Sequence, residues 1–379
     1  MALVLNEEQR LLAETAREFL DEHAPVSALR ALRDSRDATG YSRTLWQQMA
    51  ELGWASVILP ESYGGLEFGF TGLGVLLQES GRTLTASPLL ATAVVGASAV
   101  LLGGTEAQRE TYLPQLAAGE LTLALALEES HHHRPYHVAM RAELDGDSVR
   151  LSGDKCFVLD GHSADLLLVV ARSAGAPGDR AGLSVVLVPR DSAGVECQRT
   201  LMVDSRNAAS IRFDNVTLPA TAILGEPGAA GEWLDAVLDR GRVALAAEML
   251  GSAEEVFART VAWLKERVQF GVPIGSFQAL QHRASRLQAE LELACSVVLQ
   301  ALATVDDKPE QLPLIASLAK AQLNELVKLA TNEAVQLHGG IGVTDDLEIG
   351  FFLKRARVTM QIFGDTGFHK DRYASLCGY

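Results

Sequence analysis

The residues with the most familiar ligand chemistry are three consecutive histidines, His131-His132-His133, followed shortly by His137. Consecutive residues cannot all face one ion without a special loop, and no carboxylate or cysteine stands beside them at ligand spacing. The four cysteines lie far apart and form no C-x-x-C pair, which argues against a disulfide framework and a cysteine-based zinc site. The sequence therefore predicts no metal site, and we interpret the histidines as part of a polar loop.

A second stretch with chemical potential is the glycine turn Gly339-Gly340-Ile341-Gly342. It lacks the third glycine of the G-x-G-x-x-G dinucleotide motif, so any nucleotide cofactor must be held in another way. The formal charge of the chain is −15, which would repel a nucleic-acid backbone, and we expect no nucleic-acid partner. Phosphates of a cofactor must instead be met by individual arginines, backbone amides or helix N-termini.

The elements that must position these residues begin with a helical region. Asn6 is a good N-cap, Glu7 and Glu8 follow it, and apolar residues then recur at helical spacing. Further helical patterns cover 44–52, 72–81, 89–102 and 106–118, and they predict an N-terminal α-helical domain over residues 1–120. The first 20 residues lack a basic start and an apolar core, and no stretch reaches about 18 uncharged apolar residues. We expect a cytoplasmic protein with no membrane partner.

The pattern changes twice after residue 120. Short β-rich runs at 148–151, 166–171, 183–189 and 209–213 predict a middle β-domain over 121–228, with 173–182 as a hairpin connection. Long helical patterns at 233–262, 277–304, 313–338 and 350–363 predict a C-terminal four-helix bundle over 229–379. This order excludes an alternating βαβ architecture and predicts an α+β fold.

Four separated motifs then point to one family. The segment from Arg267 to Gln278 reads R-V-Q-F-G-V-P-I-G-S-F-Q and resembles the R-x-x-F-G-x-P-I-x-x-F-Q signature of acyl-CoA dehydrogenases. Residues 60–65 resemble their P-x-x-Y-G-G turn, 153–165 their G-x-K-x-x-x-x-x-G-x-x-A-D segment, and 336–342 their Q-x-x-G-G-x-G. The resemblance covers nearly the whole chain and implies an FAD-dependent flavoprotein with an acyl-CoA dehydrogenase-like fold.

The resemblance also implies a cofactor site. In the family the FAD lies between β-domain and bundle, and the adjacent protomer completes its site, so at least a dimer, or a tetramer, is expected. Arg267 would meet the pyrophosphate with its fork of N–H donors, and Gly339 and Gly340 would let backbone approach closely. The other residues that the resemblance assigns to FAD are Gln269, Phe270, Ile274, Phe277, Leu280, Gln336, Leu337, Phe157 and Thr366.

The sequence departs from the family where the catalytic base should be. Family enzymes remove the acyl α-proton with a carboxylate while the β-hydrogen leaves as hydride to the flavin. Aligning Q-I-F-G-D-T at 361–366 with the family's Y-E-G-T segment places Gly364 at the usual glutamate. The other family location is Gly241, before Arg242 at the opening of the first bundle helix. Both standard bases are absent.

Two nearby carboxylates remain as alternatives. Asp365, directly after the first position, is the better candidate base of the two, and burial could raise its pKa toward a useful value; the alternative is that it caps or braces a turn. Glu248, two helical turns beyond the second position, could serve as a base or pair with a bundle arginine. Gly364 keeps the backbone N–H that normally helps to polarise the thioester carbonyl.

The predicted β-domain departs as well. The run A-L-E-E-S at 126–130 replaces the family's A-L-T-E-P, histidines replace A-G-S-D, and F-V-L at 157–159 replaces W-I-T. His338, inside the glycine turn, could face FAD or bond to backbone.

The leading hypothesis is an FAD-dependent acyl-CoA or carrier-bound acyl-thioester dehydrogenase that resembles subunits of heteromeric members, in which a paralogous chain contributes the glutamate. The alternatives are a flavin oxidase or monooxygenase, and a non-catalytic subunit that completes a partner's FAD site. An electron-transfer flavoprotein is the expected electron acceptor.

Overall fold

The structure, a computed structural model, describes residues 4–379 and confirms the α+β fold. Its contacts divide the chain into two compact units. The bundle unit contains the residues up to Ser35, Phe70–Thr85 and Arg242–Tyr379, whereas the sheet unit contains Arg36–Gly69 and Ala86–Gly241. The helices predicted as one N-terminal domain are therefore shared between the two units, because α1, α2 and α4 group with the bundle and the rest with the sheet.

A seven-stranded mixed sheet forms the centre of the sheet unit. The strand order is β1-β4-β2-β3-β7-β6, with β5 paired to β4. β1 and β2 pair with β4 in parallel, and the remaining pairs are antiparallel. The strand bounds are β1 Leu123–Ala126, β2 Arg141–Asp145, β3 Ser148–Leu159, β4 Leu166–Arg172, β5 Leu183–Pro189, β6 Val195–Leu201 and β7 Asn207–Pro219.

The four strand patterns in the sequence fall within β3, β4, β5 and β7, and segment 173–182 joins β4 to β5 as predicted. β1, β2 and β6 were missed. β1 is only four residues long, and β6 reads V-E-C-Q-R-T-L with no buried residue, so β1 is too short and β6 too polar to stand out as a strand.

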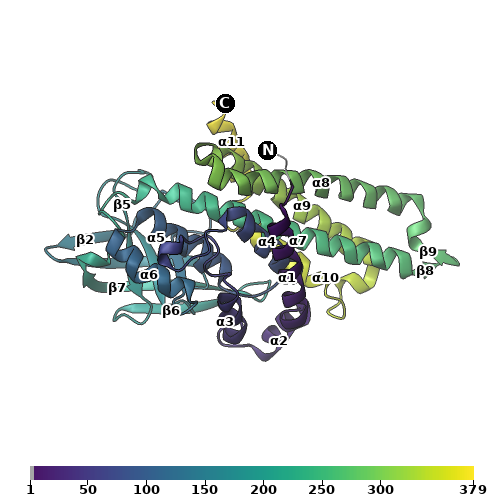
Figure 1. Ribbon diagram of the computed structural model, residues 1–379, viewed down its shortest axis with the longest axis horizontal. Helices are drawn as coiled ribbons and strands as arrows, with labels where there is room; N and C mark the ends of the chain where they lie inside the picture. Colours follow the sequence, from purple (N-terminus) through teal and green to yellow (C-terminus); the bar gives the residue numbers. More distant parts are fainter. Residues whose placement is uncertain (1–3) are drawn as a thin grey trace. The chain divides into compact units, whose positions relative to one another are not determined.

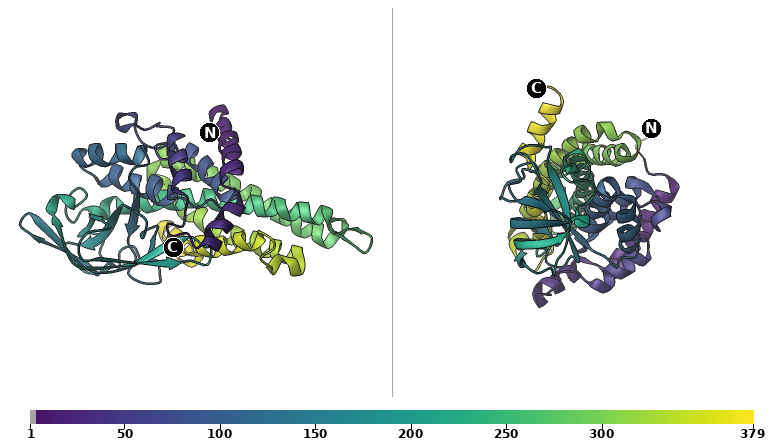
Figure 2. Two further views of the ribbon diagram at one scale, coloured as in Figure 1. Left: turned by 90° about the horizontal axis from the view of Figure 1, so that it is seen from below. Right: turned by 90° about the vertical axis from the view of Figure 1, so that its left-hand side faces the viewer.

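Helices α3 (Arg43–Glu51), α5 (Ala97–Gly103) and α6 (Glu106–Ala117), with a π-helix at Leu89–Gly96, accompany the sheet. Figure 2 shows α5 and α6 on one side of the strands. The π-helix contacts β1 closely, because a Cβ on Gly96 would lie 2.7 Å from the Cβ of Leu123.

The bundle unit is built from long helices, which Figure 1 shows with the small β8–β9 hairpin between α7 and α8. Four long helical patterns were predicted, and α7 to α10 correspond to them, but the fourth ends at Thr359 and a fifth helix, α11, follows. The helix bounds are α1 Glu7–His23, α2 Val26–Ser35, α4 Gly69–Arg82, α7 Leu234–Glu266, α8 Gln278–Asp307, α9 Leu312–His338, α10 Ile349–Thr359 and α11 Thr366–Leu376.

Two glycines bring α4 and α7 into backbone contact. A Cβ on Gly81 would lie 1.9 Å from the carbonyl oxygen of Glu248, and one on Gly251 would lie 1.8 Å from that of Gln78. Any larger residue would separate these helices. Helix α8 has the length and composition of a membrane span, but such a single helix is weak evidence, and α8 packs against α9.

Candidate functional site

The signature segment forms a tight hairpin at the end of α7. β8 (Val268–Gln269) pairs with β9 (Val272–Pro273), and the turn between them has left-handed backbone at Phe270 (φ 55°) and Gly271 (φ 78°). The Phe270 side chain is 93% exposed and touches Phe277 edge-on, with 6.1 Å between ring centroids. The two rings leave aromatic surface exposed at this hairpin.

Arg267 and the glycine turn are brought together by stacked rings. The Arg267 guanidinium lies 5.8 Å from the ring of Trp263, and Trp263 stacks on His338 at 5.2 Å. His338 Nδ1 lies 2.7 Å from the carbonyl oxygen of Ala334, which answers the question left open for this histidine: it bonds to backbone. Burial lowers the pKa of His338.

The same end of the unit gathers most of the other predicted cofactor residues. The Ile274 N–H donates to the carbonyl oxygen of Arg267 at 2.8 Å, which folds the hairpin back on α7, and Leu280 lies in the first turn of α8. Gln269 and Gln336 are exposed, whereas Leu337 is buried.

Gly339 and Gly340 face open space. A Cβ at either position would have no neighbour within 4 Å, although Gly339 has a left-handed φ of 68°. Gly342 differs, because its Cβ would lie 2.7 Å from the carbonyl oxygen of Val335. Packing within the described chain therefore explains Gly342 but gives no reason for glycine at 340.

Position 364, unlike positions 339 and 340, is surrounded by neighbouring side chains. Gly364 has a φ of 114°, and a Cβ there would lie 2.5 Å from Cδ1 of Phe368 and 2.9 Å from Nε2 of His369. Its N–H, expected to face a thioester carbonyl, donates to the carbonyl oxygen of Gln361 at 3.3 Å. This hydrogen bond is long, so a better acceptor could replace it.

Asp365 is the N-cap of α11, and Thr366 is the first residue of that helix. Its Oδ1 accepts a hydrogen bond of 2.8 Å from the N–H of Phe368. The capping alternative is therefore confirmed. The burial that we considered for Asp365 is wrong, because the residue is exposed at the turn before α11.

Glu248 pairs with a bundle arginine, which confirms that alternative. Oε1 of Glu248 accepts hydrogen bonds from Nε and one terminal nitrogen of Arg355 at 2.8 and 2.7 Å, and both side chains are about 5% exposed or less. Gly241 and Arg242 do not open the first bundle helix as expected, because α7 begins at Leu234.

In the sheet unit, Phe157 lies at an irregularity of β3. The β3–β7 register shifts between Lys155 and Val158, and Phe157 has a φ of 52° with its ring 37% exposed. Such a conformation is uncommon for a bulky residue and presents the ring outward.

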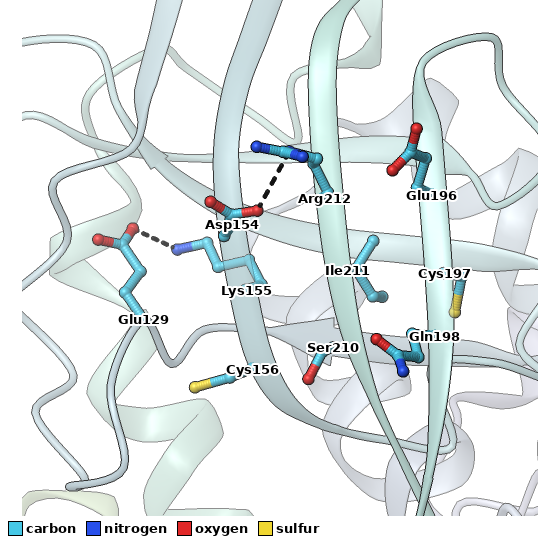
Figure 3. Close-up of a pocket in the computed structure, with 10 residues that line it drawn as sticks. All are labelled: Glu129, Asp154, Lys155, Cys156, Glu196, Cys197, Gln198, Ser210, Ile211 and Arg212. Atoms are coloured by element: carbon cyan, nitrogen blue, oxygen red, sulfur yellow. Dashed lines mark hydrogen bonds and ion pairs between the residues drawn. The ribbon is translucent and has the colours of Figure 1, made fainter.

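A cavity of about 450 Å³ lies over strands β3, β7 and β6, and Lys155 and Glu129 are among the residues that line it (Figure 3). The buried Lys155 amine donates to Glu129 at 2.8 Å and to the carbonyl oxygen of Leu127 at 3.0 Å. Glu129 also accepts from the N–H groups of Ala139 and Met140. Burial raises the pKa of Glu129, but Lys155 and these amides outweigh it and lower the pKa overall.

The sequence did not identify this pair, although Lys155 is the lysine of the G-x-K motif. The Lys155–Glu129 pair holds both ends of the loop that carries the histidines, because Lys155 bonds to Leu127 before the loop and Glu129 bonds to Ala139 and Met140 after it. Within that loop Glu128 bonds to His133 through Nδ1 and accepts from the N–H of Arg134. Among residues 4–379, no three His, Cys, Asp or Glu side chains are arranged to hold a metal ion.

Comparison with known families now adds to this geometry. Three family descriptions match in order: the acyl-CoA dehydrogenase N-terminal domain at residues 6–120, the middle domain at 126–216 and the C-terminal domain at 232–375. The chain belongs to the acyl-CoA dehydrogenase family. Members of this family are FAD-dependent oxidoreductases that act on CH–CH groups, so the predictions of family, cofactor and enzyme class are confirmed.

Individual relatives share about 30% of the sequence over the whole length. Cyclohex-1-ene-1-carbonyl-CoA dehydrogenase of Geobacter metallireducens is 30% identical, with 96% of this chain and 95% of that protein covered. Acyl-CoA dehydrogenase IpdE2 of Mycolicibacterium smegmatis is also 30% identical, with 95% and 96% covered.

Solved structures share the fold of this chain over nearly its whole length. A variant of the Tcur3481-Tcur3483 steroid ACAD is 33% identical with a TM-score of 0.87, and 98% of each chain is covered. Butyryl-CoA dehydrogenase of Megasphaera elsdenii is 25% identical with a TM-score of 0.91, and 100% of each chain is covered.

The bundle unit fits part of a flavin nucleotide. Arg267 offers a planar set of donors for phosphate, exposed Phe270 and Phe277 offer aromatic surface, and the open glycines at 339 and 340 leave room that a side chain would fill. These features lie at one end of the helices, as a nucleotide half-site requires.

Proposed function

We propose that this chain is an FAD-dependent acyl-thioester dehydrogenase that acts together with a related chain, which supplies the catalytic carboxylate. The observation that carries this proposal is Gly364. The position that holds the glutamate in the family has no side chain here, and Phe368 and His369 occupy the space a side chain would need.

The two replacement carboxylates within the chain are both engaged. Glu248 is fixed by Arg355 in the helical core, where the guanidinium holds Oε1 of the carboxylate. Asp365 caps α11 and lies at the surface. Asp365 lacks burial, and the buried Glu248 is paired with a cation, so neither has the environment expected of a general base.

The cofactor half-site supports assembly with a second chain. Arg267 would hold the pyrophosphate, and Gln269, Phe270, Ile274, Phe277 and Leu280 would line the adenosine end. Gln336, Leu337, Gly339 and Gly340 would receive the dinucleotide backbone, while Phe157 and Thr366 would contact the flavin end. The exposed ring of Phe270 needs a covering partner, so we propose a dimer at least, or a tetramer.

The chemistry divides between the chains. FAD, when bound, accepts the β-hydrogen of the acyl group as hydride. This chain would bind and orient the cofactor through Arg267 and exclude water with its apolar hairpin. The α-proton would pass to a carboxylate of the related chain. The Gly364 N–H would join the thioester site only after releasing the Gln361 carbonyl.

The substrate is an acyl thioester on CoA or on a carrier protein. Named relatives support the CoA ester, among them the cyclohex-1-ene-1-carbonyl-CoA and butyryl-CoA dehydrogenases. The two-part name of the Tcur3481-Tcur3483 steroid ACAD supports a paralogous subunit. We further propose an electron-transfer flavoprotein as electron acceptor and a cytoplasmic location.

The test compares the chain alone with the chain co-expressed beside a family member from a neighbouring gene that keeps the glutamate. Each preparation is mixed anaerobically with butyryl-, octanoyl- and palmitoyl-CoA while the flavin absorbance is followed. We expect bleaching only in the paired preparation. Bleaching by the chain alone would contradict the proposal, and rapid reoxidation by oxygen would indicate an oxidase or monooxygenase.

A second candidate is a self-sufficient dehydrogenase with Asp365 as base. It is favoured by the position of Asp365, one residue from Gly364. It is also favoured because the capping hydrogen bond from the N–H of Phe368 uses only one carboxylate oxygen, Oδ1. This candidate requires that Asp365→Ala abolish bleaching by the chain alone while Glu248→Ala retains it.

A further inference from the structure

Three buried side chains that the proposed reaction does not use surround the Phe363–Gly364 turn. Arg242 comes from α7, Lys320 from α9 and His369 from α11, and each has 0% of its surface exposed. Burying such polar groups is unfavourable unless their donors find acceptors. Each of them reaches a carbonyl group of the turn itself.

The Phe363 carbonyl oxygen accepts two of these bonds. Nε of Arg242 donates to it at 3.1 Å, and Nε2 of His369 lies 3.1 Å from it. Because a carbonyl oxygen can only accept, Nε2 of His369 must carry the proton. Two helices that are distant in sequence are thereby joined at one peptide group.

The Lys320 amine holds the next carbonyl. It donates to Gly364 O at 3.3 Å, to Thr359 O at 2.9 Å and to Oδ1 of Asn324 at 2.7 Å. A protonated lysine has three donors, and these acceptors match them. Burial, and then the charge of Arg242, lower the pKa of Lys320 well below its ordinary value.

The backbone of the turn needs such support. Phe363 has a φ of 57° and Gly364 a φ of 114°. A bulky residue in the left-handed region persists only where its surroundings determine the conformation. The hydrogen bonds from Arg242, Lys320 and His369 to the carbonyl groups of the turn hold this conformation.

The ring of Phe368 completes the enclosure. The Arg242 guanidinium lies 5.4 Å from its centroid, and Cδ1 of Phe368 would be 2.5 Å from a Cβ on Gly364. Conformation and space thus both exclude a side chain at 364.

We propose that Arg242, Lys320 and His369 are positioning residues that clamp the Phe363–Gly364 turn and, with Phe368, commit position 364 to glycine. The inference deepens the proposed function, because it explains why the chain cannot regain its own glutamate by one substitution. Its test does not require acyl-CoA oxidation.

Hydrogen–deuterium exchange of the full chain tests the clamp. Lys320→Met and His369→Leu should speed exchange in peptides covering 361–366 by about tenfold, the effect of losing one hydrogen bond of ordinary strength. His369→Gln, which can still donate to Phe363, should restore slow exchange. Lys328→Met changes an exposed lysine on the same helix and should have no effect.

Two results would overturn the clamp. Unchanged exchange at 361–366 in both variants would show that the bonds do not fix the turn. Equal acceleration in α8 peptides would show a general structural role instead.

The commitment to glycine is tested separately by melting temperature. Gly364→Ala should lower Tm by several degrees, and the loss should be smaller in a Phe368→Ala background because one of the two obstacles is gone. Equal losses in both backgrounds, or none, would overturn it. If these shifts occur while no chain pairing bleaches with acyl-CoA, the proposed function fails and the clamp stands.

Discussion

Two regions of the bundle unit align with motifs of the same family but differ in how exposed they are to solvent. The hairpin and glycine turn, residues 267–280 and 336–343, keep the family motifs and present exposed rings and open glycines. The turn at 359–369 carries Gly364 at the position that we align with the family carboxylate, and its carbonyls and glycine are enclosed by buried side chains.

The difference shows how each region would behave alone. The hairpin end leaves aromatic surface exposed, and we propose that a cofactor and a second protomer cover it. The carbonyl groups of Phe363 and Gly364 are instead held by side chains of the same unit. We therefore expect cofactor binding and stability to respond to different substitutions.

The largest effect should come from Glu248. Replacing it by leucine removes the carboxylate from a buried guanidinium and should lower the free energy of unfolding by about 3–5 kcal/mol. Chemical denaturation measures this loss. The double substitution Glu248→Leu with Arg355→Met should recover much of it, and the exposed Glu266→Gln is the control. Lost flavin bleaching at full stability would instead make Glu248 a base.

The next effect concerns the hairpin end. Arg267→Ala should weaken FAD binding by about 10- to 100-fold, the worth of a charged hydrogen bond to phosphate. Arg267→Lys should only partly restore it, because an ammonium lacks the planar fork. Ultrafiltration of the purified flavoprotein gives the affinity, with exposed Arg286→Ala as control. Retained flavin in Arg267→Ala would remove this residue from the proposed site.

A smaller effect is expected at Asp365. Asp365→Ala removes the cap of α11 and should cost about 1 kcal/mol of stability, with no change in bleaching by the paired preparation. Thermal unfolding and anaerobic titration measure the two quantities, and Asp371→Ala on the same helix is the comparison. Bleaching that disappears without loss of stability would favour the self-sufficient enzyme.

The smallest effect is a pH dependence beside the glycine turn. Hydrogen bonds from Arg33, with a smaller contribution from Arg30, lower the pKa of Asp345 to about 2. Because the folded pKa lies below the unfolded value of about 3.9, the stabilisation from this ion pairing is present above that value. It is lost as pH falls toward 2. Melting curves from pH 5 to 2 should show the loss, reduced by high salt.

Asp345→Asn should remove that part of the pH dependence, whereas the neighbouring Asp346→Asn should keep it. An identical acid profile in both variants would show that the tie of Asp345 to α2 contributes nothing measurable.

Much of the fold was predictable because its elements carry local signals. Helix α1 was visible from the Asn6 cap and the apolar spacing after it, and the capping bond from Gln9 to Asn6 is present. The buried strands β4 and β5 were visible from their continuous apolar runs. Helix α11 was missed because its sequence lacks an apolar stripe and its start depends on a cap at Asp365.

The candidate site divides in the same way. Sequence alone determined the family and the cofactor class, and it led us to propose that the catalytic glutamate is absent, because these depend on which residue types stand at fixed spacing. It left the roles of Asp365, Glu248 and His338 open, since each is set by a partner distant along the chain or by backbone geometry.

Only the tertiary structure decided those roles. It paired Glu248 with Arg355 from another helix, stacked His338 on Trp263, and joined Arg242, Lys320 and His369 at one turn. No sequence pattern encodes these contacts, because they arise where helices α7, α9, α10 and α11 pack together and every buried polar group must find a partner.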